Sequence, residues 1–192
     1  MTSFLRQLSA AARMLLALSL ICGVVYPLVI LGVGQVVAKD QANGSPVHAA
    51  GGTVGSSLIG QAFTEGQWFQ GRPSASEYAG DTSGGSNLGP LDDRQRKAMD
   101  DRRVALLETN PEALVTLPAD ALTASASGLD PHVSEAYALW QVPRVAKARN
   151  LPEVQVRQLV LLHTRGRLAG FLGQPRVNVL ELNLALESRF PS

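Results

Sequence analysis

An apolar run without a formal charge extends from Met14 to Val37 and constrains this chain more than any other feature of its sequence. As a helix it would span roughly 36 Å, enough to cross a hydrocarbon core of about 30 Å with some tilt. A cleaved signal peptide is one alternative, because residues 36–38 (Val-Val-Ala) resemble a small-residue cleavage site, but apolar regions of signals are much shorter. A buried helix of a soluble protein, the other alternative, rarely runs this long without charge. We therefore expect a transmembrane helix over residues 14–37.

Pro27 lies in the middle of this run. It frees a backbone carbonyl, which lipid tolerates best where another helix packs nearby. Pro27 is accordingly a candidate contact with a partner helix. The alternative is that Gly and Pro are simply common in membrane helices.

The charges that flank the run predict its orientation. Arg6 and Arg13 precede it without any acidic residue, whereas Lys39 and Asp40 follow it and largely cancel. Because positive charge is retained on the cytoplasmic side of a membrane, we expect residues 1–13 inside and everything after Lys39 outside the cytoplasm.

Composition narrows the class of the remaining chain. Of the 192 residues, 17 are Lys or Arg and 16 are Asp or Glu, so that without Arg6 and Arg13 the balance is 15 against 16. No clustered basic face is evident, and we expect no nucleic-acid partner. The one cysteine, Cys22, lies in the apolar run, which excludes a disulfide scaffold and a cysteine zinc site from the part outside it. The length fits one domain plus an anchor.

The part after the anchor mixes strand and helix signals. Residues 38–56 contain Asn-Gly-Ser-Pro and Gly-Gly and are expected to be a linker or edge region, followed by an extracytoplasmic domain over residues 57–192. Residues 57–63 and 67–71 are candidate strands, and residues 83–90 are loop by composition. Without a repeating βαβ rhythm, the fold class is expected to be α+β.

Helices are expected in three places, and a fourth segment is ambiguous. One begins after Asp92 or Asp93, ends near Thr109 and carries one buried stripe of Met99, Leu106 and Leu107. A second follows a cap at Ser134 and breaks or restarts at Pro143, and a third leads from Pro152 toward His163. Residues 177–188 stay open, because their alternation suggests a strand whereas Asn178 could cap a helix.

The sequence gives only weak indications of a catalytic or metal site. The glycine-rich loop at residues 83–90 superficially resembles a phosphate cradle, but no Gly-Lys-Ser/Thr follows it. Ser125 or Ser127 with His132 or His163 would be needed for a membrane-tethered envelope hydrolase, yet the segment lacks a nucleophile elbow. His132 and His163 with Asp130 lack a recognised metal spacing. We therefore expect no catalytic residue and no metal site, and a binding or assembly role.

Several motifs in order carry a family resemblance over nearly the whole chain. They are Leu58-Ile-Gly-Gln61, Gly71-Arg-Pro-Ser-Ala75, residues 83–90, residues 123–134, Arg144-Val-Ala146, His163-Thr164 and residues 170–186. With them the sequence resembles the C subunit of the bacterial high-affinity potassium-transporting P-type ATPase, the Kdp complex. It departs from the usual pattern at Ala126, where Gly is expected, and at Gln174, where Glu is usual.

The resemblance implies a non-catalytic subunit of a potassium uptake pump in the bacterial inner membrane. Its partners would be a potassium-conducting, channel-like subunit and a P-type ATP-hydrolysing subunit. ATP would bind the ATP-hydrolysing subunit, and this chain would raise the affinity of that subunit for ATP as a catalytic chaperone. Because the domain lies across the membrane from cytoplasmic ATP, the effect would be a coupling between sites. A free-standing nucleotide-binding regulator would need the opposite orientation. The candidate partner contacts are Pro27, Arg72, Ser83, Asn87, Asp92, Asp93, Asp130, His132, Arg176 and Asn178.

Overall fold

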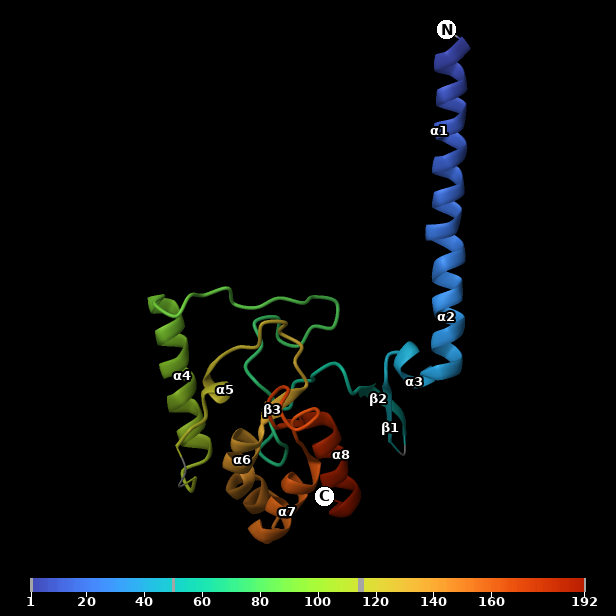
Figure 1. Cartoon of the computed structure of the whole chain (residues 1–192). Helices are drawn as coiled ribbons and strands as arrows, with labels where there is room; N and C mark the ends of the chain where they lie inside the picture. The colour runs from blue at the N-terminus through green and yellow to red at the C-terminus, as the bar shows by residue number, and fades with distance from the viewer. Residues whose placement is uncertain (1, 50, 114–115, 192) are drawn as a thin grey trace. The chain divides into compact units, whose positions relative to one another are not determined.

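The computed structural model describes residues 2–49, 51–113 and 116–191 and divides into two compact units (Figure 1). The first unit is Met1–Pro46 and the second is Val47–Ser192. The first holds a long apolar helix and the second holds mixed helix and sheet. The predicted fold class, one N-terminal apolar helix followed by an α+β domain, is confirmed.

The first unit is dominated by three consecutive helical segments: α1 (Thr2–Leu20), η1 (Ile21–Val25) and α2 (Tyr26–Val37). The stretch Ser3–Val37 is the one helix among the described residues that is long and apolar enough to cross a membrane, and none of it is buried against protein. Apolar side chains are exposed all along it, as expected of a helix whose environment is lipid. The helix begins earlier than the predicted span, so most of residues 1–13 are helical too.

A π-helical turn accommodates Pro27. Pro27 is the second residue of α2, and α2 directly follows the wider turn η1. A proline ring clashes with the carbonyl four residues earlier and supplies no N–H. A local π turn relieves both within one helix, so the chain stays helical through this position.

The segment expected as a linker or edge region is ordered in two parts. A single helical turn, α3 (Lys39–Ala42), follows the long helix, and β1 (Pro46–Ala49) and β2 (Gly52–Ser56) then form a two-stranded sheet. Between α3 and β1, Gly44 and Ser45 have φ angles of 86° and 50°. Gly44 therefore suits a backbone that leaves the right-handed region.

The core of the second unit is a three-stranded antiparallel sheet with three helices. The strand order is β3 (His132–Ser134), β5 (Arg176–Asn178), β4 (Thr164–Arg165), with Val133 opposite Val177 and Thr164 opposite the same Val177. The helices are α6 (Glu135–Ala148), α7 (Glu153–His163) and α8 (Val179–Arg189), which Figure 1 shows gathered beside these strands. The fully buried apolar side chains include Val133, Tyr137, Val142, Val145, Val156, Val160, Val177, Leu182 and Leu186.

Local capping places the helices where the sequence predicts them. The side chains of Asp92, Ser134 and Asn178 accept hydrogen bonds from the N–H groups of Arg94, Tyr137 and Glu181. These bonds satisfy donors that a helix leaves free at its start. The ambiguous residues 177–188 are therefore the end of β5 followed by α8.

The prediction that Pro143 breaks or restarts its helix is wrong. Helix α6 continues through it as one element. Val142 and Val145, on either side, are completely buried in the core. Their packing outweighs the roughly 3 kcal/mol that an interior proline costs.

The predicted buried stripe on the charged helix is also wrong. Helix α4 (Asp93–Thr109) has no fully buried residue; Met99 and Leu106 are only half-buried, and Leu107 is exposed. Figure 1 shows α4 at the edge of the domain, beside α5 (Ala119–Leu122). Too few apolar side chains lie on one face of α4 to bury a stripe.

The two candidate strands at residues 57–63 and 67–71 are absent. Residues 57–63 begin in a turn, whereas at residues 69–70 other groups take the place of a neighbouring strand. The N–H and carbonyl of Phe69 bond to the side-chain amide of Asn183, both at 2.9 Å. Those of Gln70 bond to the amide of Gln141 at 2.8 and 3.1 Å. Two side-chain amides, one from α8 and one from α6, thus satisfy the backbone hydrogen-bonding groups of this segment without a sheet.

Candidate functional site

Two loops far apart in sequence are hydrogen-bonded together along their length. We call residues 71–85 and 123–134 the loop junction. The Ser74 hydroxyl donates to the Gly128 carbonyl at 2.6 Å, and the Ser125 N–H donates to the Pro73 carbonyl at 3.0 Å. Further along, the Gly84 N–H and the Ser83 hydroxyl donate to the Ser127 carbonyl at 2.8 and 3.1 Å. The junction is therefore a fixed surface built from loop backbone.

Arg72 lies at the centre of the loop junction. Its guanidinium contacts Asp130 at 3.5 Å and the carbonyls of Thr123 and Ala124 at 3.3 and 3.4 Å. These distances are at the long limit for hydrogen bonds, and the buried Nε has no partner among the described residues. Arg72 also lines three cavities, of about 630, 470 and 460 Å³. Arg72 is thus a cation held by long contacts beside three cavities, and a guanidinium so placed suits an acidic or carbonyl-bearing group.

Asp130 is held ionised by its neighbours. Burial alone would raise its pKa, but hydrogen bonds from the ring and backbone N–H of His132, with the charges of His132 and Arg72, lower the pKa below its ordinary value. The His132 N–H lies 3.0 Å and the ring Nδ1 3.4 Å from Asp130 Oδ1. The arrangement fixes the carboxylate between two loops.

Tyr78 closes the other side of Arg72. Its hydroxyl donates to the Arg72 carbonyl at 2.6 Å. Burial, and then the negative charge of Asp130, raise the pKa of Tyr78 to about 12, although Arg72 opposes this. The phenol is therefore neutral at every physiological pH and acts as a hydrogen-bond donor.

The depressed pKa of Asp130 gives a prediction for acid stability. The carboxylate contributes stability that is fully present above its ordinary value of about 4 and is lost as pH falls through the lower folded value. Asp130→Asn is expected to cost about 1 kcal/mol at neutral pH and to flatten the loss of stability below about pH 4. Urea unfolding as a function of pH measures both; a variant whose acid slope equals that of the wild type would contradict this assignment.

Four predicted contact residues surround one cavity. The 470 Å³ cavity is lined by Arg72, Asp130, His132 and Arg176, together with Asp120 and Ser134 among others. Asp120 accepts from the Ser134 N–H at 2.7 Å and its hydroxyl at 2.9 Å, so that it is already occupied. The charged side chains around this cavity are therefore of both signs, and they lie beside apolar ones such as Val133 and Pro175.

The remaining predicted contacts lie elsewhere. Asn87 is exposed with φ 53°, Asp92 caps α4 and pairs with Arg94 at 2.7 Å, and Asp93 pairs with Arg96 at 2.8 Å. The Arg94 hydrogen bonds lower the pKa of Asp92. Asn178 is buried, where it caps α8 and donates to the Ser57 carbonyl at 2.8 Å. Pro27 is in the other unit, on the long helix.

The hydrolase constellation is not assembled. Ser127 accepts the Leu129 N–H, His132 contacts Asp130, and His163 contacts the Leu159 carbonyl on its own helix. Ser125 is buried. Among the described residues no contact joins either serine to either histidine, and no group of three His, Cys, Asp or Glu side chains is placed to hold a metal ion.

Sequence reasoning missed residues that build the site from a distance. Tyr78, Asp120, Gln141 and Asn183 hold the loops in place, and none was singled out in advance. For the two amides a signal existed, because each is a polar residue among the apolar positions of its helix. For Tyr78 and Asp120 no local signal exists.

Comparison with known proteins gives one consistent family. A family model described as the c chain of the K+-transporting ATPase, KdpC, matches residues 8–188. The potassium-transporting ATPase KdpC subunit of Kineococcus radiotolerans is 51% identical, covering 100% of this chain and 98% of its own. The subunits of the same name from Sorangium cellulosum and Koribacter versatilis are 48% and 47% identical, covering 95% and 97% of this chain and 98% and 96% of their own.

Proposed function

This chain belongs to the KdpC family, and we propose that, as an accessory subunit of a potassium uptake pump, it holds a potassium-conducting subunit and an ATP-hydrolysing subunit together. The observation that carries the proposal is the family match over residues 8–188, which includes both the apolar helix and the domain. One membrane helix with a domain of loop-built surface suits a subunit that binds neighbours in the bilayer and beside it.

The orientation belongs to the same proposal. The N-terminus lies in the cytoplasm, the helix crosses the bacterial inner membrane, and the domain lies outside. Arg6 and Arg13 support this, because basic residues before the helix have no acidic counterpart there.

This chain has no catalytic site of its own in our proposal. ATP binds the ATP-hydrolysing partner, and any rise in that subunit's ATP affinity is a coupling free energy transmitted through the membrane. The unassembled serine and histidine groups described above support the absence of hydrolase chemistry.

The domain is proposed to cap the outer face of the potassium-conducting subunit. The loop at residues 83–90 is held at its first half, where Ser83 and Gly84 bond to Ser127. Its second half and the adjoining Leu91 are mostly exposed. A surface that is fixed at one end and accessible at the other is preorganised for contact.

Substitution in this exposed half is expected to weaken assembly without unfolding the domain. Asn87→Ala with Leu91→Ser should reduce the yield of complete complex about tenfold, as the loss of about 1.4 kcal/mol of contact energy would. Co-purified partner per tagged chain is the measurement. Asp81→Ala, also exposed and in the same region, is the control; equal yields from both variants would place the interface elsewhere.

The experiment that tests the function is co-purification. The tagged chain is extracted in mild detergent from cells grown at limiting potassium. We expect a P-type ATPase and a large polytopic membrane protein to accompany it, with potassium-stimulated ATP hydrolysis. A chain that purifies alone, stable and with hydrolytic activity of its own, would overturn the proposal.

A further inference from the structure

Exposed apolar side chains of the second unit concentrate in one short segment. Of the twelve large apolar residues that are exposed in the described part of this unit, five lie within residues 161–172. Leu168 and Phe171 are each 71% exposed and Leu172 is 51% exposed. We call these three residues the apolar tip. So dense a patch at the end of a loop marks an interaction site.

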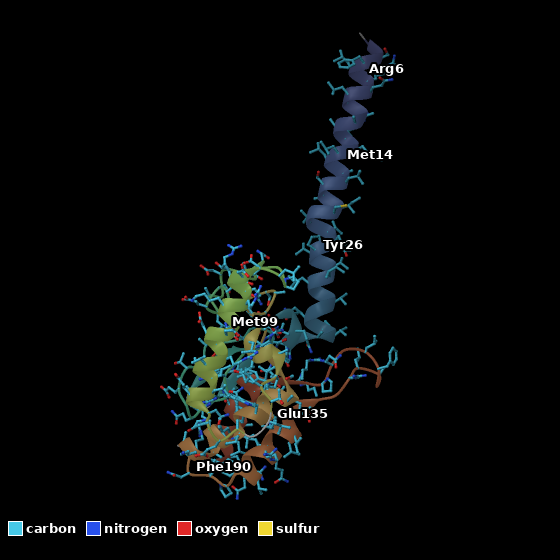
Figure 2. All side chains as sticks on the ribbon, turned by 90° about the vertical axis from the view of Figure 1, so that its left-hand side faces the viewer. Arg6, Met14, Tyr26, Met99, Glu135 and Phe190 are labelled. Carbon is cyan, nitrogen blue, oxygen red and sulfur yellow. The ribbon has the colours of Figure 1, made fainter. Side chains whose placement is uncertain are left out.

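The backbone of the tip is closed on itself. Leu168 and Leu172 exchange hydrogen bonds at 2.9 and 3.0 Å, while the N–H groups of Gly170 and Phe171 donate to Arg167 and Leu168 carbonyls at 3.2 and 3.3 Å. Figure 2 shows the orange segment between α7 and β5 standing out from the body of the domain. Because most of its backbone N–H groups already have partners, this loop loses little by leaving water.

The surroundings of the tip are basic. No acidic residue occurs between Glu153 and Glu181, whereas this interval holds Arg157, Arg165, Arg167 and Arg176. Arg165 is paired with Glu181 at 2.7 Å, and Arg167 has, among the described residues, only a 3.5 Å contact with Gln174. Positive charge beside exposed leucine and phenylalanine is the composition of segments that bind the surface of an anionic bilayer.

We propose that the apolar tip inserts into the headgroup region of the bilayer in which the chain is anchored, with Arg167 and Arg176 facing anionic lipid phosphates. Nine residues, 38–46, join the end of α2 to the second unit. So short a tether raises the effective concentration of lipid around the domain, and a contact too weak to bind free vesicles is sufficient. A pocket on a protein partner would not need the basic residues that flank the tip, or an interval of 27 residues without an acidic one, which is why lipid is the occupant we choose.

The test uses the full-length chain reconstituted in vesicles, labelled at one position with an environment-sensitive fluorophore. Cys22→Ser removes the native thiol, and Ala169→Cys places the label within the loop without altering the three tip residues. Leu91→Cys, at a site that is 90% exposed, is the matched control. Vesicles of phosphatidylcholine with and without phosphatidylglycerol carry nitroxide groups near the lipid headgroups.

We expect the label at position 169 to be quenched by nitroxide lipid, more strongly with phosphatidylglycerol, and the label at position 91 to behave as in water. Phe171→Ser with Leu172→Ser should abolish the quenching. Arg167→Gln or Arg176→Gln should each lower the ratio of inserted to uninserted tip about fivefold. Equal, low quenching at both positions would overturn the proposal. The proposal would also be overturned if the label at position 169 left the aqueous environment only when the other pump subunits are present, since a protein would then cover the tip.

Discussion

Replacing Gly128 with alanine is expected to lower the free energy of unfolding of the soluble domain by about 2–5 kcal/mol. Gly128 has φ +70°, and a Cβ there would lie 2.7 Å from the Gly84 carbonyl oxygen and closer still to the Ser76 hydroxyl. The left-handed backbone contributes about 1–2 kcal/mol of this loss, and the overlap contributes about 1–3 kcal/mol. Urea unfolding followed by tryptophan fluorescence measures it, because Trp68 and Trp140 both lie in the domain.

Gly84 supplies the matched control for this substitution. A Cβ at Gly84 meets nothing within 4 Å, and its φ is not positive. Gly84→Ala also keeps the N–H that bonds to Ser127. We expect a change within about 0.5 kcal/mol; equal losses for the two variants would show that the close approach of the loops at Gly128 does not limit stability.

Gly128 also bears on Ala126, the position where the family resemblance leads us to expect glycine. Ala126 does not have positive φ, whereas Gly128 does. The turn therefore depends on Gly128. The residue at position 126 instead approaches Gly85, whose added Cβ would meet the Ala126 carbonyl oxygen at 2.9 Å.

Features that depend on near neighbours in sequence were predictable. Asp92, Ser134 and Asn178 each cap a helix through a donor two or three residues away, and each was identified from residue type and the apolar pattern that follows. The long apolar helix is equally local. Arg72, Asp130, His132 and Arg176 were named from motifs, but nothing in the sequence places them around one cavity.

Features that depend on distant partners were not predictable. Residues 67–71 have the composition of a strand, yet their hydrogen-bonding partners lie 71 and 114 residues away on helices. Pro143 has the local signature of a helix end, and tertiary burial overrides it. In both cases a long-range contact outweighs a local preference.

The second large effect concerns the buried amide of Asn183. Its side chain is 2% exposed and bonds to both the N–H and the carbonyl of Phe69, which is completely buried. Asn183→Leu fills a similar volume but leaves both peptide groups without partners. Since each unsatisfied buried group costs about 1–3 kcal/mol, we expect a loss of about 2–6 kcal/mol in the free energy of unfolding, measured by the same urea titration.

Gln141→Leu is the comparison that makes this result interpretable. It removes the equivalent pair of bonds from Gln70, the next residue, which is only half-buried, and also the 2.8 Å bond that Arg144 donates to the Gln141 side chain. Arg144 keeps its bonds to the Gly66 and Trp68 carbonyls. Water can replace the lost partners at Gln70 more easily than at Phe69, so Gln141→Leu should destabilise the domain less than Asn183→Leu. The reverse order, or a loss below about 1 kcal/mol for Asn183→Leu, would mean that residues 69–70 are held by packing of the Phe69 ring rather than by the two amides. The expected order would instead show that side-chain amides from two helices serve as the missing strand, and that they position the chain leading into Arg72.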